Sequence, residues 1–345
     1  MKNFWTELPK PFTALAPLDG VTDVVFRQIV TETGKPDVLF TEFTMTDGLV
    51  SKGHEKVAER LLLTDEQKPV VAQIWGTKPE HFFQVAKELQ TRGFAGIDIN
   101  MGCPVREVTN RGACSGLIRT PNLAAEIIQA TKEGAGELPV SVKTRIGFEK
   151  ETIDEWISFL LKQEIAILTV HLRTVKELSQ VPAHWELMEQ IMKLRDKIAS
   201  QTLIVGNGDI MSRDEINEKF KEYGCDGFMI GRGIFSNPWL FNKKIDLQKI
   251  TIEQRISLFL HHIELFEKQW SLDGKEDLTV NEIKVGWHGT KHFALLKKFA
   301  KTYIQNFPEA ANFREKLMET KTLEELKQTL KNYNPGLLPI APRKT

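Results

Sequence analysis

The chain has 345 residues, and its 46 lysines and arginines balance 46 aspartates and glutamates, so its formal net charge is +0. A content of 41% hydrophobic and 27% charged residues is that of an ordinary soluble globular protein. Apolar runs such as residues 165–170 are far shorter than the roughly 18 residues of a membrane-spanning helix, and the first residues lack the apolar core of a signal peptide. Three cysteines without a CxxC pair indicate neither a disulfide framework nor a zinc ribbon. We therefore expect a cytoplasmic protein with no membrane span.

From residue 12 to about residue 235 the chain repeats one pattern, in which a short apolar run is followed by a turn and an amphipathic stretch. Stretches such as EHFFQVAKELQTRG, which closes on a glycine, are typical of helices. Eight strand-like runs alternating with helices predict a (β/α)8 TIM barrel over residues 1–243. A doubly wound sheet is the alternative, but it would need a switch point and usually has fewer strands. The eight runs are residues 12–17, 38–43, 70–76, 96–102, 139–147, 166–173, 203–209 and 227–233.

Residues 244–345 show helical periodicity only and predict a smaller, all-helical domain. From Lys284 to Pro308 there is no aspartate or glutamate, although five lysines occur, so a neutral total hides a basic segment. Over residues 291–304 the pattern predicts one amphipathic helix. Its apolar face carries Phe293, Leu296, Phe299, Tyr303 and Ile304, and its opposite face carries Lys297, Lys298 and Lys301.

Polar and reactive residues gather at the carboxyl ends of the predicted strands, which is the rim that carries the active site in barrels of this kind. Lys143 and Arg145 alternate along one strand, so both side chains should point into the mouth of the barrel. Lys143 could meet the polar edge of a flavin, or it could pair with Asp98. The rim residues are Pro17, Gln73, Asn100, Cys103, Lys143, Arg145, His171, Asn207 and Arg232.

Glycine-rich turns end the seventh and eighth runs, GNGD at 206–209 and GRG at 231–233. Glycines let backbone N–H groups approach a phosphate, so the two turns together predict a ligand that carries one. His171 could orient that ligand, act as a base or be a core histidine. His288 and His292 have the spacing of helical metal ligands, but no third ligand completes a site, so we expect no metal.

Cys103 lies between Gly102 and Pro104, which imply a rigid, exposed turn. Its thiol could be a core group, a nucleophile or a general acid. Cys114 and Cys225 are more typical of inert packing.

The chain resembles the tRNA-dihydrouridine synthases over nearly its whole length. In that family FMN and NADPH serve to reduce the C5–C6 bond of uridine in tRNA. The combination of INMGCP, VKTRIG and MIGRG in this order is highly specific. The motifs that carry the resemblance are APLDGVTDVVFR (16–27), AQIWG (72–76), INMGCP (99–104), GACSGLI (112–118), VKTRIG (142–147), VHLRT (170–174), AHW (183–185), GNGDI (206–210), MIGRGIFSNPWLF (229–241) and FPEAANFR (307–314).

The resemblance implies that a hydride passes from flavin N5 to uracil C6 while Cys103 protonates C5 from the opposite face. An ordinary thiol, with a pKa of about 8.5, would be mostly protonated near neutral pH. Asn100 and Arg145 would seat the uracil, and the loop 104–118 would close on the base. The residues implied to bind FMN are Pro17, Leu18, Asp19, Gln73, Lys143, His171, Asn207, Gly208, Asp209, Gly231 and Arg232, and those implied to bind tRNA are Lys291, Lys297, Lys298, Lys301 and Arg314.

Three departures from the family bear on which uridine is modified rather than on the reaction, namely Leu18, Leu172 and the segment ELSQVPAHW (177–185). One rival is a flavin barrel that acts on a small molecule, similar to dihydroorotate dehydrogenases or ene-reductases, but it would not explain the basic helical segment. The other is a tRNA-binding protein that has lost catalysis, which would not need Cys103, Lys143 and both phosphate turns. Nothing in the sequence requires an oligomer, so we expect a monomer.

Overall fold

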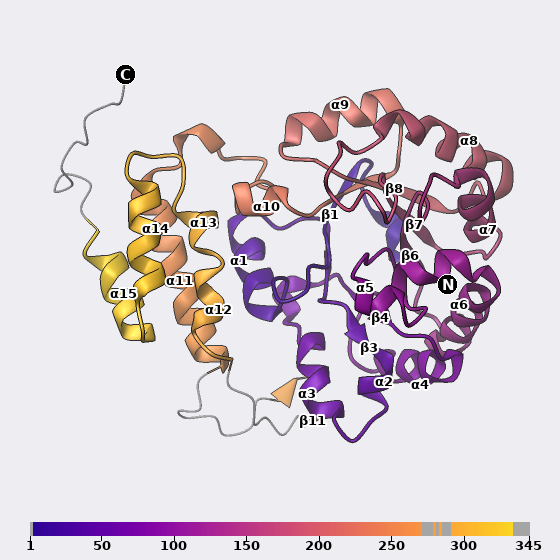
Figure 1. Cartoon of the computed structure of the whole chain (residues 1–345), viewed down its shortest axis with the longest axis horizontal. Helices are drawn as coiled ribbons and strands as arrows, with labels where there is room; N and C mark the ends of the chain where they lie inside the picture. Colours follow the sequence, from indigo (N-terminus) through magenta and orange to yellow (C-terminus); the bar gives the residue numbers. More distant parts are fainter. Residues whose placement is uncertain (1–2, 271–278, 281–282, 285–290, 334–345) are drawn as a thin grey trace.

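The computed structural model describes residues 3–270, 279–280, 283–284 and 291–333. It has two lobes, a β/α barrel and a smaller helical lobe beside it (Figure 1). The expected boundary near residue 243 falls between the last barrel helix, α10 (Gly233–Ser236), and α11 (Ile252–Trp270). Within the described residues no helix is long and apolar enough to cross a bilayer.

The strands of the barrel are all parallel and form a closed ring. Their order is β2-β1-β9-β8-β7-β6-β5-β4, and β2 returns to pair with β4, with Leu39 opposite Val70. This closure confirms the TIM barrel and excludes the doubly wound sheet. The second run ends early, at Phe40, and the two-residue β3 then pairs with β4. The strands are β1 (Phe12–Leu15), β2 (Val38–Phe40), β3 (Thr44–Met45), β4 (Val70–Trp75), β5 (Gly96–Met101), β6 (Val140–Arg145), β7 (Ile167–His171), β8 (Leu203–Asn207) and β9 (Gly227–Ile230).

Helices surround this ring, and local sequence signals set their ends. Asp23 caps α1 by accepting a hydrogen bond from the N–H of Phe26, and Ser212 caps α9 in the same way from Glu215. The C-terminus of α9 is at Gly224, whose φ of +66° suits glycine. The helices of the barrel are α1 (Val24–Gly34), α2 (Thr46–Leu49), α3 (His54–Ala58), α4 (Pro79–Leu89), α5 (Arg106–Thr109), α6 (Pro121–Ala135), α7 (Ser158–Leu161), α8 (Met188–Ile198), α9 (Arg213–Tyr223) and α10.

Alternation along the strands divides the apolar residues between two packed clusters. Phe12 and Ala14 of β1 belong to a smaller cluster that also holds Trp5, whereas Leu15 belongs to the larger cluster formed with the surrounding helices. Trp5 is 1% exposed, and its ring centroid lies 5.7 Å from that of Phe12. The packed interior makes the barrel a rigid support for the residues at its rim.

The helical lobe is built from α11, α12 (Ala294–Lys297), α13 (Ala300–Tyr303), α14 (Ala310–Glu319) and α15 (Leu323–Lys331), and β10 (Thr279–Val280) pairs with β11 (Ile283–Lys284). The single helix predicted over residues 291–304 is wrong, because two four-residue helices occupy this stretch. The N–H of Leu296 donates to the carbonyl of Phe293, and that of Phe299 to Leu296. This three-residue spacing brings the apolar side chains onto one side, which packs into the core.

Candidate active site

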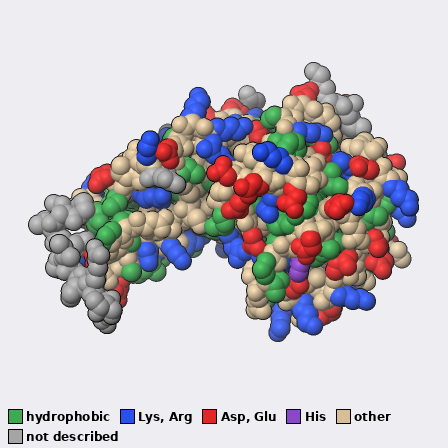
Figure 2. Space-filling view, turned by 90° about the horizontal axis from the view of Figure 1, so that it is seen from above, with side chains coloured by type: hydrophobic (Ala, Val, Ile, Leu, Met, Phe, Trp, Pro, Cys, Tyr) green, Lys and Arg blue, Asp and Glu red, His purple; other side chains and the backbone are tan. Residues whose placement is uncertain are grey.

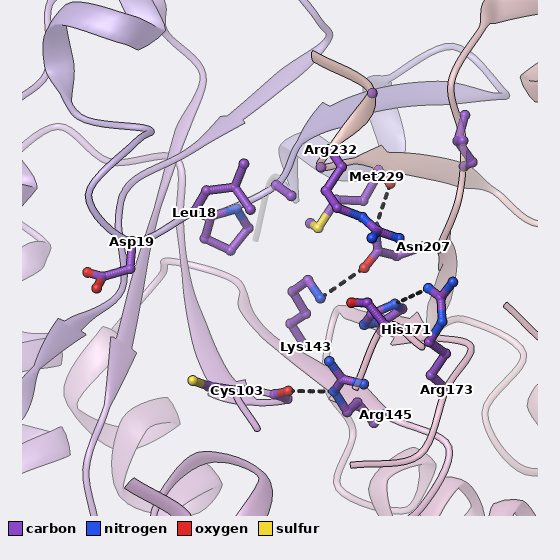
Figure 3. A pocket seen from close by; sticks show the side chains of 18 of the residues that line it. Leu18, Asp19, Cys103, Lys143, Arg145, His171, Arg173, Asn207, Met229 and Arg232 are labelled. Carbon is purple, nitrogen blue, oxygen red and sulfur yellow. Dashed lines mark hydrogen bonds between the residues drawn. The ribbon is translucent and has the colours of Figure 1, made fainter. Parts of the chain in front are cut away.

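A cavity of about 440 Å³ lies at the carboxyl ends of the barrel strands (Figure 3). It is lined from β1 and from β4 to β9, so side chains far apart in the sequence meet in one place. All the predicted rim and flavin-binding residues line it, namely Pro17, Leu18, Asp19, Gln73, Asn100, Cys103, Lys143, Arg145, His171, Asn207, Gly208, Asp209, Gly231 and Arg232.

Lys143 points from β6 into this cavity. Its Nζ donates to Oδ1 of Asn207 at 3.1 Å, and Nδ2 of Asn207 donates in turn to the carbonyl of Met229 at 2.8 Å. Burial, followed by the charge of Arg145, lowers the pKa of Lys143 to about 8. The alternative, a direct bond to Asp98, is not formed, and the ammonium faces the cavity (Figure 3).

The carboxylate of Asp98 belongs to a buried polar chain behind the cavity. It accepts hydrogen bonds from Ser141 Oγ at 2.5 Å and from Gln73 Nε2 at 2.7 Å, and burial raises its pKa to about 6. Nδ2 of Asn100 donates to Oε1 of Gln73 at 2.9 Å. The other end of the Asn100 amide accepts from the backbone N–H groups of Gly102 and Cys103, both at 3.0 Å. Asn100 therefore shapes the turn that holds the cysteine.

Cys103 lies half-buried in the cavity wall. A hydrogen bond from the Cys114 thiol is the main cause that lowers the pKa of Cys103, to about 7. Burial opposes this shift, while the N–H of Val105 and the charge of Arg145 support it. The expectation of an ordinary pKa for the Cys103 thiol is thus wrong. Cys114 is fully buried, and burial raises its own pKa well above the ordinary value, as expected for a packing thiol. Ser115 Oγ donates to the carbonyl of Cys103 at 2.7 Å and fixes the two segments together.

Arg145 joins the cysteine turn to the loop that follows β7. Its Nε donates to the carbonyl of Gly102 at 2.8 Å, and its Nη1 donates to those of Thr174 at 2.9 Å and Leu178 at 3.0 Å. Burial, with the nearby charge of Arg173, lowers the pKa of Arg145 to about 10. The side chain thus bridges three backbone segments while it lines the cavity.

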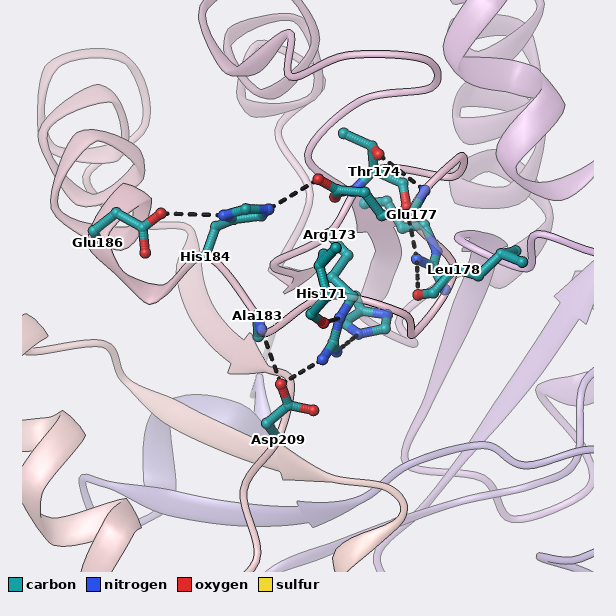
Figure 4. Close-up of polar contacts among 11 residues, drawn as sticks. His171, Arg173, Thr174, Glu177, Leu178, Ala183, His184, Glu186 and Asp209 are labelled. Atoms are coloured by element: carbon teal, nitrogen blue, oxygen red, sulfur yellow. Dashed lines mark hydrogen bonds and ion pairs between the residues drawn. The ribbon is translucent and has the colours of Figure 1, made fainter.

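Arg173 is a residue of this cavity that the sequence analysis missed. Its Nη1 donates to Nε2 of His171 at 3.0 Å, its Nε donates to the carbonyl of Val181 at 2.7 Å, and its Nη2 pairs with Asp209 (Figure 4). Burial and the surrounding positive charges lower the pKa of His171 well below its ordinary value, so the ring is neutral. The sequence does contain a signal for Arg173, because this residue lies in the motif VHLRT, two residues after His171 and at the end of the same strand.

The two glycine turns differ in whether the fold itself requires a glycine. Gly208 has φ of +138°, and a Cβ there would lie 2.6 Å from Cβ of Ala183, so the fold itself requires glycine. A Cβ at Gly231 would meet nothing closer than Ala16 Cβ at 3.7 Å, so its free space opens into the cavity. Next to it, Arg232 is 58% exposed and donates to Asp209 at 2.8 Å.

Asp19 lies at the edge of the cavity, and its carboxylate pairs with Arg60 rather than facing inward (Figure 3). His292 accepts a hydrogen bond at Nδ1 from the N–H of Ala294, and His288 lies outside the described residues. Among the residues the model describes, no cluster of candidate metal ligands is found.

None of the five cations expected to bind tRNA lines the cavity, and their surroundings differ. Lys291 pairs with Asp23 at 2.9 Å, and Arg314 donates to the carbonyl of Ile304 at 2.7 Å. Lys297 donates to the carbonyls of Met318 at 2.8 Å and Thr320 at 2.5 Å. Nζ of Lys298 lies beside Gly20. Lys301 is exposed on α13, and no polar contact of its side chain is seen within the described residues.

A closed parallel barrel with converging polar side chains at its carboxyl rim defines a TIM-barrel enzyme. A solved structure of 2-naphthoyl-CoA reductase has the same fold, with a TM-score of 0.52 and 12% identity over 67% of this chain and 49% of that one. The family model described as "Dihydrouridine synthase (Dus)" matches residues 14–335. The chain belongs to this family, and it is an oxidoreductase.

Two named relatives match the chain almost end to end. A "Probable tRNA-dihydrouridine synthase" of Staphylococcus aureus (strain MRSA252) is 45% identical over 334 residues, which is 96% of both chains. The "Probable tRNA-dihydrouridine synthase 2" of Bacillus subtilis (strain 168) is 43% identical over 96% of this chain and 97% of its own.

Proposed function

We propose that the protein is a tRNA-dihydrouridine synthase that uses FMN and NADPH to reduce the C5–C6 bond of specific uridines in tRNA. The observation that carries this proposal is the position of Cys103 in one cavity with Lys143 and with the glycine turns after β8 and β9. The names of the relatives support the choice of tRNA as the substrate. We also propose that the enzyme acts as a monomer in the cytoplasm, which is supported by a cavity lined by residues of one chain and by tRNA as the substrate.

The residues present fit a flavin mononucleotide. The open space at Gly231, with Arg232 and Asn207 beside it, would receive the phosphate end. Lys143 would donate to the polar edge of the ring, since its only hydrogen bond among the described residues is to Asn207. When bound, the flavin supplies the hydride that is added to uracil C6, and NADPH restores it.

The residues of the chain hold the uracil and supply the proton. Asn100 and Arg145 fix the turn on which Cys103 sits, so the thiol has a defined place relative to the base. The Cys103 S–H gives its proton to C5 as the hydride reaches C6, which completes the addition of two hydrogens. With a pKa of about 7, the thiol is about half protonated at neutral pH. Activity should therefore fall as the pH rises above this value.

Purified protein should be yellow and should form dihydrouridine in unmodified tRNA when NADPH is supplied. Cys103→Ala should keep flavin reduction by NADPH and tRNA binding but lose about 10²–10⁴-fold in dihydrouridine formation, because it removes the general acid. Cys225→Ala is the matched control, since Cys225 is buried outside the cavity. A protein that cannot be reconstituted with flavin, or a Cys103→Ala variant with normal turnover, would contradict the proposal.

A further inference from the structure

Large apolar side chains are exposed around the mouth of the cavity. In the described part of the barrel lobe four such side chains stand out, Phe83 at 39%, Val105 at 48%, Leu178 at 41% and Met211 at 43% exposed. Phe83 lies on the outer helix α4, but the other three lie in the loops after β5, β7 and β8. Met211 lines the cavity, and the other two are chain neighbours of residues that do. Three of the four therefore lie in loops at the rim that holds the cavity.

Leu178 is held in this exposed position by its backbone. Its φ is +53°, in the left-handed region that disfavours a residue with a Cβ. Arg145 holds its carbonyl, and its N–H donates to the carbonyl of Val175 at 3.2 Å. In Figure 4 the side chain points away from the polar contacts that brace this loop. A strained backbone that presents an apolar side chain to solvent indicates a contact outside the chain.

The loops braced around Leu178 are rigid enough to present it. Nε2 of His184 lies 3.0 Å from Oε1 of Glu177, and the N–H of Thr174 donates to the same carboxylate at 2.7 Å. Arg173 holds the far end of the loop through the carbonyl of Val181. Because the loop is already ordered, binding of a partner to Leu178 would cost little further conformational entropy.

The other two apolar residues have neighbours that fit RNA. Met211 directly precedes Ser212, the N-cap of α9, where an apolar residue commonly packs on its own helix, yet 43% of it is exposed at the cavity. Val105 is followed by the exposed Arg106 and Glu107 at the start of α5 and by the exposed Arg111 after it. Cationic side chains can contact the phosphates of an RNA strand while neighbouring apolar side chains contact its bases.

We propose that Leu178, Val105 and Met211 form an apolar rim that packs against the nucleotides flanking the target uridine. This rests on the proposed function, in which the uracil leaves its stack to enter the cavity. Extrusion of a base exposes the faces of its neighbours to water, and apolar side chains at the opening cover those faces. Arg106 and Arg111 contact the adjoining phosphates.

Two variants of Leu178 separate this role from a structural one. Leu178→Ala and Leu178→Gly both remove the side chain, but glycine relieves the left-handed backbone and alanine does not. Leu178→Gly should therefore have the higher melting temperature of the two. Both should lose about tenfold in kcat/KM for tRNA, expressed relative to the rate of flavin reduction by NADPH, as expected for the loss of one buried apolar side chain. Phe83→Ala is the matched control, and it should retain wild-type kcat/KM.

A direct readout is the emission of 2-aminopurine placed next to the uridine that the wild-type enzyme reduces. The wild type should raise this emission on binding as the neighbour unstacks, and Leu178→Gly should raise it less. The proposed rim would be overturned if Leu178→Gly kept the emission and the kcat/KM of the wild type. It would also be overturned if Leu178→Ala lost kcat/KM while Leu178→Gly retained the wild-type value. Failure of the wild type to form dihydrouridine would instead overturn the proposed function, and it is measured before any variant is made.

Discussion

The chemistry of Cys103 depends on groups that the chain brings to it from elsewhere. Its place after a strand end could be predicted from the sequence, because the Gly and Pro around it indicate a turn. Its pKa could not, because the hydrogen bond from Cys114 forms only when residues 103 and 114 are folded against each other. Arg173 was missed for a related reason, since its role is set by contacts with His171 and Asp209 rather than by its own motif.

Removing the Cys114 thiol should shift the pH dependence of the enzyme. Cys114→Ala deletes the donor that chiefly lowers the pKa of Cys103, so that pKa should rise toward the ordinary thiol value. A general acid works only while protonated, so the alkaline limb of the pH–rate profile should move up by about one pH unit. The profile of Cys225→Ala should match that of the wild type, and an unshifted limb in Cys114→Ala would refute the proposed hydrogen bond.

Gly231→Ala should weaken flavin binding without harming the fold. Apart from the two residues next to Gly231 in the chain, the added methyl group would lie no closer than 3.7 Å to any atom of the protein, so the melting temperature of the apoprotein should not change. The methyl would occupy space proposed for the ligand, and we expect about tenfold weaker FMN binding by fluorescence titration. Gly208→Ala is the contrasting variant, because its Cβ would clash with Ala183 and lower the melting temperature. Unchanged FMN affinity in Gly231→Ala would place the phosphate elsewhere.

At the scale of elements, strand and helix periodicity predicted the barrel well because each strand must bury its side chains on both faces of the ring. The segment 291–304 was misjudged for a physical reason. Its apolar residues at 293, 296 and 299 fit a three-residue spacing, and the chain forms two short helices, α12 and α13, with a break at residues 298 and 299. The apolar periodicity of the segment does not reveal this break.

Lys297 and Lys301 should behave differently although they are four residues apart. Lys297→Ala would leave two carbonyls at the end of α14 without their donor, which should cost about 1 kcal/mol of unfolding free energy. Lys301→Ala should change stability by less than about 0.5 kcal/mol. If Lys301 contacts a tRNA phosphate, its loss should weaken tRNA binding and reduce the salt dependence by about one ion. Denaturant titration and binding at several salt concentrations measure the two effects, and equal unfolding free energies would contradict the assigned role of Lys297.

At the scale of the whole molecule, the two lobes meet over both apolar and charged contacts. The rings of Phe26 and Phe299 stack with centroids 5.0 Å apart, and Lys291 reaches Asp23 at the N-terminus of α1. Glu42 is 2% exposed beside a cavity of about 220 Å³ between the lobes, and burial raises its pKa. Figure 2 shows a concave hollow between the lobes, with Lys and Arg side chains along its edge. The cations predicted for tRNA thus partly serve to hold the lobes together.

Lys291→Met should loosen this interface. Burial opposes ionisation of Asp23, but the charge of Lys291 keeps its pKa below the ordinary value of 3.8. Above that pH the pair stabilises the fold, so its loss should cost about 1–3 kcal/mol and speed amide exchange in α1 and α11. The difference from the wild type should shrink as the pH falls and Asp23 becomes protonated in both proteins. Lys301→Met is the control, and a constant difference down to low pH would show that the ion pair is not its cause.

The sequence by itself determined the barrel, the helical lobe and the identity of the residues at the rim, because strand alternation and turn residues are local properties of the chain. Tertiary structure decided how those residues act. In the folded chain the Cys114 thiol donates to Cys103, and Arg145 and Arg173 brace loops. Lys291 forms an ion pair with Asp23 rather than lying on a free face. A charge or a thiol takes its pKa and its partner from groups distant in sequence, and only the folded chain specifies which groups those are.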